Sequence, residues 1–177
     1  MINKPKSEPI FTFKRLTQED LPLLYIWFKK PHVAKWWLTP EKDEDFFTKF
    51  LERIRSVSTF PFLVLMSNKP IGYIQYYRIN TPREIAESWI PENQETTVGT
   101  DQFIGEEDSI GKGYGTLFIK EFMTYLTTTL DPTITTIIVD PSVDNFAAIR
   151  CYEKVGFMHL GTYKTWWGQT VLMKYEI

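Results

Sequence analysis

The stretch Gly111-Lys112-Gly113-Tyr114-Gly115-Thr116 stands directly before an apolar segment with helical periodicity, and it is the most informative part of this sequence. Three of its six residues are glycine. Glycine adopts backbone conformations closed to other residues, so successive N–H groups can converge on one point. The start of the following helix adds the positive end of its dipole. The stretch therefore predicts an anion-binding cradle, most simply for a pyrophosphate, although such a run alone also suits a flexible turn.

A second segment, residues 145–157, indicates what the predicted cradle binds. It reads Asn-Phe-Ala-Ala-Ile-Arg-Cys-Tyr-Glu-Lys-Val-Gly-Phe and follows a βαβ-like stretch. The pattern Asn-x-x-Ala-x-x-x-Tyr-Glu-Lys-x-Gly-Phe at this distance from the glycines resembles the GNAT superfamily of N-acetyltransferases. The resemblance implies that acetyl-CoA is the co-substrate, that the cradle binds its phosphates, and that the second segment completes the coenzyme site.

Composition indicates an ordinary enzyme domain. The chain has 177 residues, of which 43% are hydrophobic and 16% aromatic, enough for one core, so we expect a single domain over residues 1–177. The formal net charge of −2 offers no basic field for nucleic acid or an anionic membrane. No apolar run reaches the length of a bilayer span and residues 1–9 lack a signal core, so we expect a cytoplasmic protein. One cysteine and two histidines predict neither a disulfide nor a metal site.

Hydrophobic periodicity alternates between strand and helix along the chain. Strands are expected at 11–16, 62–66, 71–77, 95–104, 135–139, 157–162 and 171–175, and helices at 21–30, from 40 onward, at 113–128 and at 144–154. The helix that starts near Pro40 has a charged face, which we expect to be solvated. Residues 80–94 read as a long loop of the kind that is often functional. These elements predict an α/β (α+β) fold of the GNAT type, a mixed, mostly antiparallel sheet with helices on both faces.

The resemblance narrows to the aminoglycoside 6′-N-acetyltransferases. The segments that carry it are His32 to Trp37, Ile71 to Tyr77, Gly99 to Gln102, Asp140 to Ser142 with Asn145, and Ala148 to Lys154. Two departures stand out: Ile110 replaces an Arg or Gln common in the superfamily, and the loop 81–94 differs from the family's usual acidic, Trp-paired version. The first leaves a cradle made of backbone N–H groups intact, whereas the second bears on which drugs are accepted.

Acetyl transfer to an ammonium requires a base, a group that polarises the thioester carbonyl, and an acid for the leaving thiolate. Asp101, at the end of a predicted strand, matches the family aspartate that meets the reacting amine, although an aspartate there can also anchor a loop. The family places the carbonyl near the backbone N–H of Phe103 or Ile104. Tyr152 matches the family acid, since a phenol with a pKa of about 10 keeps its proton at neutral pH; an aromatic residue on such a helix otherwise suits the core.

Further residues are candidates for holding the coenzyme. Asn145 matches the family residue that meets the pantetheine arm, and it can equally cap the helix that follows. Lys112 and Lys154 suit the phosphates or are ordinary surface lysines. Cys151 lies mid-helix with no histidine near it in sequence, which favours a small buried residue over a covalent acyl carrier. The full expected coenzyme set is Phe103, Ile104, Gly111, Lys112, Gly113, Tyr114, Gly115, Thr116, Asn145 and Lys154.

An aminoglycoside is a polycation rich in hydroxyls, so its pocket should combine carboxylates with aromatic rings. The expected substrate-binding residues are Trp36, Trp37, Gln75, Glu87, Trp89, Asp101 and Asp140. Asp140 can instead anchor a turn, one of the two tryptophans can be core, and Glu84 or Glu92 can take the place of Glu87. Other amines also fit the motif, namely protein amino termini or lysines, polyamines and siderophore precursors, and a non-catalytic acyl-CoA-binding module would share the cradle.

Overall fold

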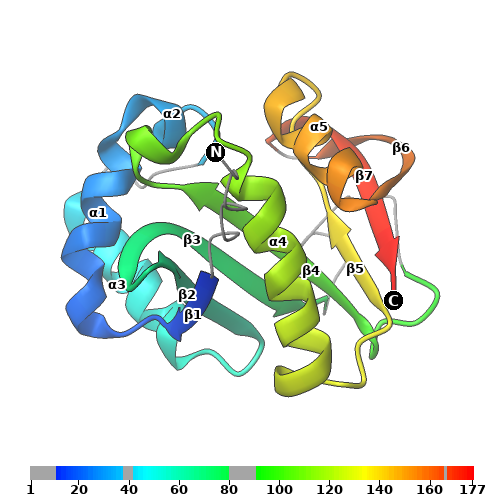
Figure 1. Cartoon of the computed structure of the whole chain (residues 1–177), viewed down its shortest axis with the longest axis horizontal. Coiled ribbons are helices and arrows are strands. Elements are labelled where there is room, and N and C mark those ends of the chain that lie inside the picture. The colour runs from blue at the N-terminus through cyan, green and yellow to red at the C-terminus, as the bar shows by residue number, and fades with distance from the viewer. Residues whose placement is uncertain (1–10, 38–41, 80–90, 166) are drawn as a thin grey trace, which may run out of the picture.

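The computed structural model describes residues 11–37, 42–79, 91–165 and 167–177, and within them one seven-stranded sheet has the order β1-β2-β3-β4-β5-β7-β6 (Figure 1). The strands are β1 (Phe11–Arg15), β2 (Thr59–Met66), β3 (Lys69–Arg78), β4 (Thr97–Ile104), β5 (Thr136–Val139), β6 (Met158–Thr165) and β7 (Gly168–Glu176), and the helices are α1 (Leu21–Lys29), α2 (Pro31–Ala34), α3 (Asp43–Arg55), α4 (Tyr114–Tyr125) and α5 (Phe146–Val155). In this sheet β4 and β5 are parallel, and the other neighbouring pairs are antiparallel. The predicted mixed, mostly antiparallel sheet is confirmed.

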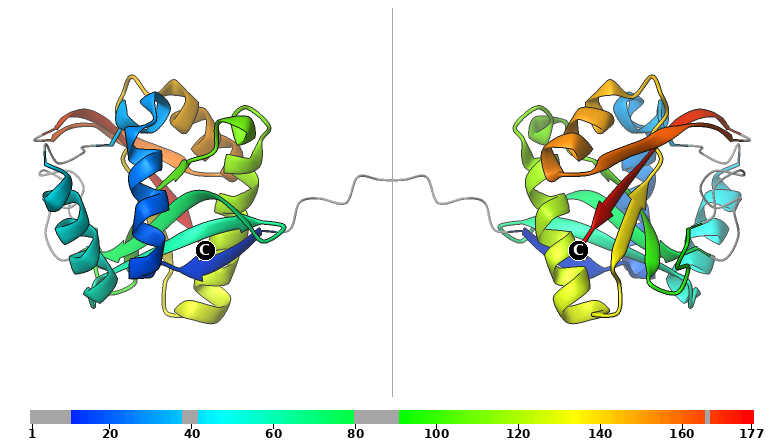
Figure 2. Two further views of the ribbon diagram at one scale, coloured as in Figure 1. Left: turned by 90° about the vertical axis from the view of Figure 1, so that its left-hand side faces the viewer. Right: turned by 90° about the vertical axis from the view of Figure 1, so that its right-hand side faces the viewer.

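Helices cover both faces of the sheet (Figure 2). On one face, α1 and α3 pack their aromatic and aliphatic side chains against Leu63 of β2 and Tyr73 of β3. On the other face, α4 and α5 cover a larger core that includes Phe62, Ile74 and Ile137 from the strands. Because side chains alternate along a strand, Tyr73 and Gln75 of β3 lie on the face of α1 and α3, and Ile74 and Tyr76 lie on the face of α4.

Local sequence signals explain most element boundaries. Ser67 and Asn68 both have positive φ, 50° and 64°, which gives the β2–β3 hairpin a tight two-residue turn. The N–H of Thr17 donates to Asp20 Oδ2 at 2.9 Å, as part of a capping box directly before the first helix. Gly156 ends α5 in the left-handed region with φ 116°.

One helix was not predicted. Pro31 ends α1, as the sequence indicates, but it also begins the short helix α2. Proline suits the first position of a helix because its fixed φ is already helical and its missing N–H would have no partner there. None of the helices in the described part of the chain is long and apolar enough to cross a bilayer.

The two parallel strands part halfway along β4. Thr97, Val98 and Gly99 pair with β5, but β4 then continues to Ile104 in contact with β3 alone, while β5 ends at Val139 (Figure 1). The second half of β4 therefore has an edge that faces away from β3 and that β5 does not cover. This opening lies at the carboxyl ends of two adjacent parallel strands, where α/β folds commonly bind ligands.

The close approach of β3 and β4 requires glycine at position 72. A Cβ added to Gly72 would lie 2.4 Å from the backbone carbonyl oxygen of Phe103 on the neighbouring strand. We expect Gly72→Ala to lower the free energy of unfolding by about 1–3 kcal/mol, because backbone has to move to accept the methyl group. Chemical denaturation measures the change.

Gly115→Ala is the matched control for this substitution. Its Cβ would meet Cys151 Sγ at an ordinary 3.5 Å, and alanine in a helix gains up to about 1 kcal/mol over glycine. Equal stability of the two variants would show that β4 moves freely away from β3 at this point.

Candidate active site

A cavity of about 410 Å³ opens where β4 and β5 part. Side chains from α3, β3, β4, the segment after β5, and α5 line it. These are Trp36, Trp37, Lys49, Arg53, Thr59, Gln75, Tyr77, Thr100, Asp101, Gln102, Asp140, Pro141, Ser142, Asn145, Ala148, Tyr152 and Trp167. Of the residues that the sequence singled out, the structure brings Trp36, Trp37, Gln75, Asp101, Asp140, Asn145 and Tyr152 together here.

Two carboxyl groups face each other across the opening. Gly99 pairs with Ile138, so continuing this parallel register by two residues brings Asp101 opposite Asp140. Burial raises the pKa of Asp101 above its ordinary value, which a hydrogen bond from Gln75 and the charge of Arg53 partly offset. Burial, and then the negative charge of Asp101, raise the pKa of Asp140 well above its ordinary value. Oδ2 of Asp140 is buried without a hydrogen-bond partner among the described residues, so the pair is suited to a cationic ligand.

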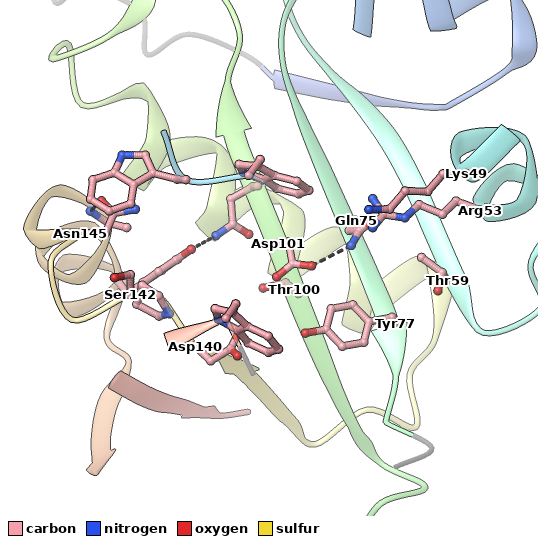
Figure 3. Close-up of a pocket in the computed structure, with 17 residues that line it drawn as sticks. Lys49, Arg53, Thr59, Gln75, Tyr77, Thr100, Asp101, Asp140, Ser142 and Asn145 are labelled. Carbon is pink, nitrogen blue, oxygen red and sulfur yellow. Dashed lines mark hydrogen bonds between the residues drawn. The ribbon is translucent and has the colours of Figure 1, made fainter. Parts of the chain in front are cut away.

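Asp101 is held in place by a chain of hydrogen bonds. Nε2 of Gln75 donates to Oδ2 of Asp101 at 2.7 Å (Figure 3). The hydroxyl of Tyr73 in turn donates to Oε1 of Gln75 at 2.7 Å. Both supporting residues are buried. Because the tyrosine hydroxyl donates to Oε1, the amide of Gln75 must present its N–H₂ group to the carboxylate. Gln75 thus orients Asp101 as well as lining the cavity.

Tyr152 reaches the opening from α5, on the other face of the sheet. Burial raises the pKa of its phenol well above the ordinary value, and the charge of Asp101 adds to this, so the group keeps its proton at neutral pH. Nε2 of Gln102 donates to the phenol oxygen. An oxygen that accepts from Gln102 directs its own hydrogen elsewhere, which leaves the phenol ready to donate to a ligand.

Gln102 is a site residue that the sequence reasoning missed. It follows Asp101 directly, and strand alternation turns the two side chains to opposite faces of β4. Asp101 lies with Gln75 on the face of α1 and α3, and Gln102 lies with Tyr152 on the face of α4 and α5. This alternation was the signal available in the sequence: it predicts that Gln102, next to the candidate base, points to the opposite face of the strand.

The glycine-rich cradle has the predicted backbone. Gly111 and Gly113 lie in the left-handed region with φ 75° and 79°, and a Cβ at either would meet nothing within 4 Å. Gly113 is the N-cap of α4, whose first residues are Tyr114, Gly115 and Thr116. The space before the helix is therefore open to an anion, while Lys112 and Lys154 are exposed and lie outside the cavity.

Strand geometry distinguishes the two candidate N–H donors of β4. The N–H of Gly105 donates to the carbonyl of Ile71 on β3 at 2.8 Å. Alternate residues point the same way, so the N–H of Phe103 is also directed to β3 and that of Ile104 to the uncovered edge. Phe103 instead packs its ring between Trp27, Phe28, Trp37 and Tyr73. Ile104 is the better placed of the two to meet a coenzyme. Oε1 of Gln102 beside it is buried and has no hydrogen-bond partner within the described part of the chain, which also fits a ligand in this opening.

Several alternatives are resolved by the structure. Asn145 caps α5, since its Oδ1 accepts from the N–H of Ala148 at 3.2 Å, and it also lines the cavity. Trp36 and Trp37 are both half-buried and both line the cavity, so neither is purely core or purely surface. Burial raises the pKa of the Cys151 thiol, which agrees with an unreactive, half-buried residue. No group of residues suited to a metal ion occurs in the described ranges.

Two expectations need correction or stay open. The charged face of α3 is exposed at Asp45, Glu52 and Arg55, as expected, but Lys49 and Arg53, at its border with the buried Phe46 and Phe50, line the cavity. A charged residue at such a border has the same sequence pattern whether it meets bulk water or a ligand site. Glu87 and Trp89 lie outside the described residues, and so do Pro40 and Glu41, where α3 was expected to begin.

Comparison with known proteins identifies the family. A family model described as an acetyltransferase (GNAT) domain matches residues 17–165. The chain belongs to the GNAT acetyltransferases. It is 34% identical over 172 residues to aminoglycoside N(6′)-acetyltransferase type 1 of Klebsiella pneumoniae, covering 94% of this chain and 83% of that protein.

Solved structures agree with this assignment. The GNAT chain superposes on a crystal structure of aminoglycoside acetyltransferase AAC(6′)-Ib with coenzyme A at a TM-score of 0.82 and 32% identity, covering 94% of this chain and 95% of that one. A structure of AAC(6′)-Ib with coenzyme A and kanamycin gives a TM-score of 0.81 at 32% identity, with the same coverage of both chains. This acetyltransferase is therefore an enzyme that uses acetyl-CoA as its co-substrate.

The buried carboxyl of Asp140 should cost the free enzyme stability. A carboxyl with a raised pKa binds its proton more tightly in the folded state, so stability falls as the pH rises from the ordinary value of 3.8 through the folded pKa. We expect Asp140→Asn to be more stable than wild type at pH 7 by on the order of 1 kcal/mol, and the difference to vanish near pH ~4. Denaturant unfolding across this pH range measures it.

The exposed Asp144 provides the control. Asp144→Asn removes a carboxyl from the same segment and should leave stability unchanged at both pH values. A loss of stability in Asp140→Asn at pH 7 would show that the carboxylate is needed to hold the fold.

Proposed function

We propose that this enzyme transfers the acetyl group of acetyl-CoA to the 6′-amine of an aminoglycoside, by direct transfer in a ternary complex. The observation that carries the proposal is the facing pair Asp101 and Asp140 at the opening between β4 and β5. Two carboxyls whose ionisation is opposed by burial gain most from a ligand that brings several positive charges. The similarity to AAC(6′)-Ib, which has been crystallised with kanamycin, supports the same class of acceptor.

In this proposal Asp101 is the base that takes a proton from the ammonium of the acceptor. Its raised pKa makes it a stronger base than an ordinary carboxylate, and the hydrogen bond from Gln75 fixes its direction. Asp140 binds the same amine or a neighbouring one. Trp36 and Trp37 supply apolar walls, and Glu87 and Trp89 remain predicted contacts.

Tyr152 is the proposed acid that protonates the coenzyme thiolate as it leaves, with Gln102 as its positioning residue. The residues proposed to hold the coenzyme are the cradle from Gly111 to Thr116, Asn145 at the start of α5, and the edge N–H of Ile104, with Lys112 and Lys154 near the phosphates. The acetyl thioester supplies the transferable group, and these residues orient it toward Asp101.

The proposed cellular location follows from the same function. An enzyme that uses cytosolic acetyl-CoA and inactivates an antibiotic acts in the cytoplasm, and we propose that residues 1–177 do so as one domain. Kanamycin is the acceptor to test first, because it carries the 6′-amine and occupies the related AAC(6′)-Ib site.

The role of Tyr152 is tested by Tyr152→Phe. This change keeps the ring and its packing on Phe157 but removes the proton donor. We expect kcat to fall by roughly 10²–10⁴-fold, while the dissociation constant of coenzyme A, measured by calorimetry, stays near the wild-type value. Wild-type kcat throughout the pH range would assign protonation of the thiolate to another group or to water.

The substrate and the base are tested together by steady-state thiol release with kanamycin, with product mapping by NMR. Wild type should acetylate the 6′-amine, and kcat/KM should fall as the pH drops through the raised pKa of Asp101, because only the carboxylate accepts a proton. Asp101→Asn keeps the shape and should nearly abolish transfer. Good turnover of a peptide or polyamine with none of kanamycin would refute the proposed acceptor.

A further inference from the structure

Helix α3 directs two positive charges into the acceptor side of the cavity. Lys49 and Arg53 are four residues apart, so they project from the same face of α3. Both line the cavity together with Asp101 and Gln75. Figure 3 shows their side chains extending from α3 toward Gln75, on the side of Asp101 away from Asn145. Two cationic side chains repel a polycationic acceptor, so the binding of a polycation does not by itself explain why they line the cavity.

Arg53 interacts with the hydroxyl of Tyr73, but its hydrogen-bonding capacity is not fully used within the described residues. Nη1 of Arg53 is buried and has no hydrogen-bond partner among the described residues. Burial lowers the pKa of Lys49, and the neighbouring charge of Arg53 lowers it further. The guanidinium rests on the ring of Phe50, 4.8 Å from its centroid, which fixes its position but satisfies no N–H group. A buried donor left without an acceptor is costly, so this pair is suited to oxygen atoms of a ligand.

The pair lies beside the group that receives the acceptor amine. The charge of Arg53 contributes to the pKa of Asp101, and both residues contribute to the cavity on the α1 and α3 side of the sheet. If the proposed function holds, the sugar ring whose 6′-amine meets Asp101 also lies against Lys49 and Arg53. The remaining substituents of that ring are either hydroxyls or further amines.

We infer that Lys49 and Arg53 select the substituents of the acetylated sugar ring: they donate hydrogen bonds to its hydroxyl oxygens and disfavour a second ammonium on it. This inference rests on the proposed aminoglycoside function. The carboxylates of Asp101 and Asp140 accept one ammonium, and the two cations repel another that comes close to α3. A carboxylate on the acceptor would satisfy the cations as well, but it would meet the repulsion of the two aspartates.

Kanamycin A and kanamycin B test the inference, because they differ in one substituent of this ring, a 2′-hydroxyl in A and a 2′-amine in B. Wild type should have a higher kcat/KM for kanamycin A at pH 7. In the double variant Lys49→Gln, Arg53→Gln, the ratio of kcat/KM for A to that for B should fall by about tenfold, which corresponds to about 1.4 kcal/mol. Each single variant should give part of this change.

Arg55→Gln is the matched control, since Arg55 is an exposed cation on the same helix that does not line the cavity. It should leave the A-to-B ratio unchanged. Arg53→Lys keeps the charge and should retain most of the preference, which separates electrostatic selection from packing on Phe50. Lys49→Gln provides the test should Arg53→Gln prove unstable on thermal unfolding.

The outcomes separate this inference from the function on which it rests. Acetylation of both kanamycins with the same ratio in wild type and double variant would overturn the inference and leave the proposed function standing. Absence of turnover with every aminoglycoside would overturn both. Turnover confined to amines that carry a carboxylate, and lost in Arg53→Gln, would show that the pair binds an acid group instead.

Discussion

The site depends on the parting of β4 from β5. Two adjacent parallel strands normally continue side by side, but here the ladder between them ends at Gly99 and Ile138. The segment after β5 stays paired with β7, where the carbonyl of Pro141 accepts from the N–H of Val171 at 2.9 Å. β4 continues along β3, so an opening forms inside the sheet rather than on its surface. Asp101, Gln102, Asp140 and Tyr152 all meet at this opening.

An opening within a sheet connects its two faces. Because side chains alternate along β4, successive residues beside the opening point to different faces. Odd-numbered residues of β4 share a face with α1 and α3, and even-numbered ones share a face with α4 and α5. Asp101 and Gln102 are neighbours in sequence, yet one is bonded to Gln75 and the other to Tyr152. The acceptor amine and the coenzyme can thus approach from opposite faces and meet between the strands. In the proposed reaction, the base Asp101 and the acid Tyr152 therefore serve two different molecules.

Sequence reasoning reached the residues whose roles depend on local pattern and missed those whose roles depend on packing. The cradle glycines, the hairpin turn and the end of α5 are set by backbone conformations that only a few residue types adopt, so they were predictable. The register that brings Asp101 opposite Asp140 follows from a four-residue strand, and the family resemblance marked both residues. Lys49 and Arg53 gave no such signal, because the tertiary position of α3 alone decides that these two side chains meet the cavity. Pro31 gave a misleading signal, because a proline that ends one helix can also be the first residue of the next.

The charges of the cavity act on Asp101 in opposite directions. Withdrawal from water raises its pKa and so makes the carboxylate a better base. Unopposed, the same effect would keep the group protonated and unable to accept a proton from the amine. Arg53 and the amide of Gln75 oppose it, and both reach Asp101 from the face on which the acceptor is expected. Asp140 lacks this support and has the more strongly opposed ionisation of the two. This difference argues that Asp101 is the base. Asp140 then ionises fully only when the positive charge of the acceptor lies beside it, so binding of the cation and ionisation of Asp140 are coupled.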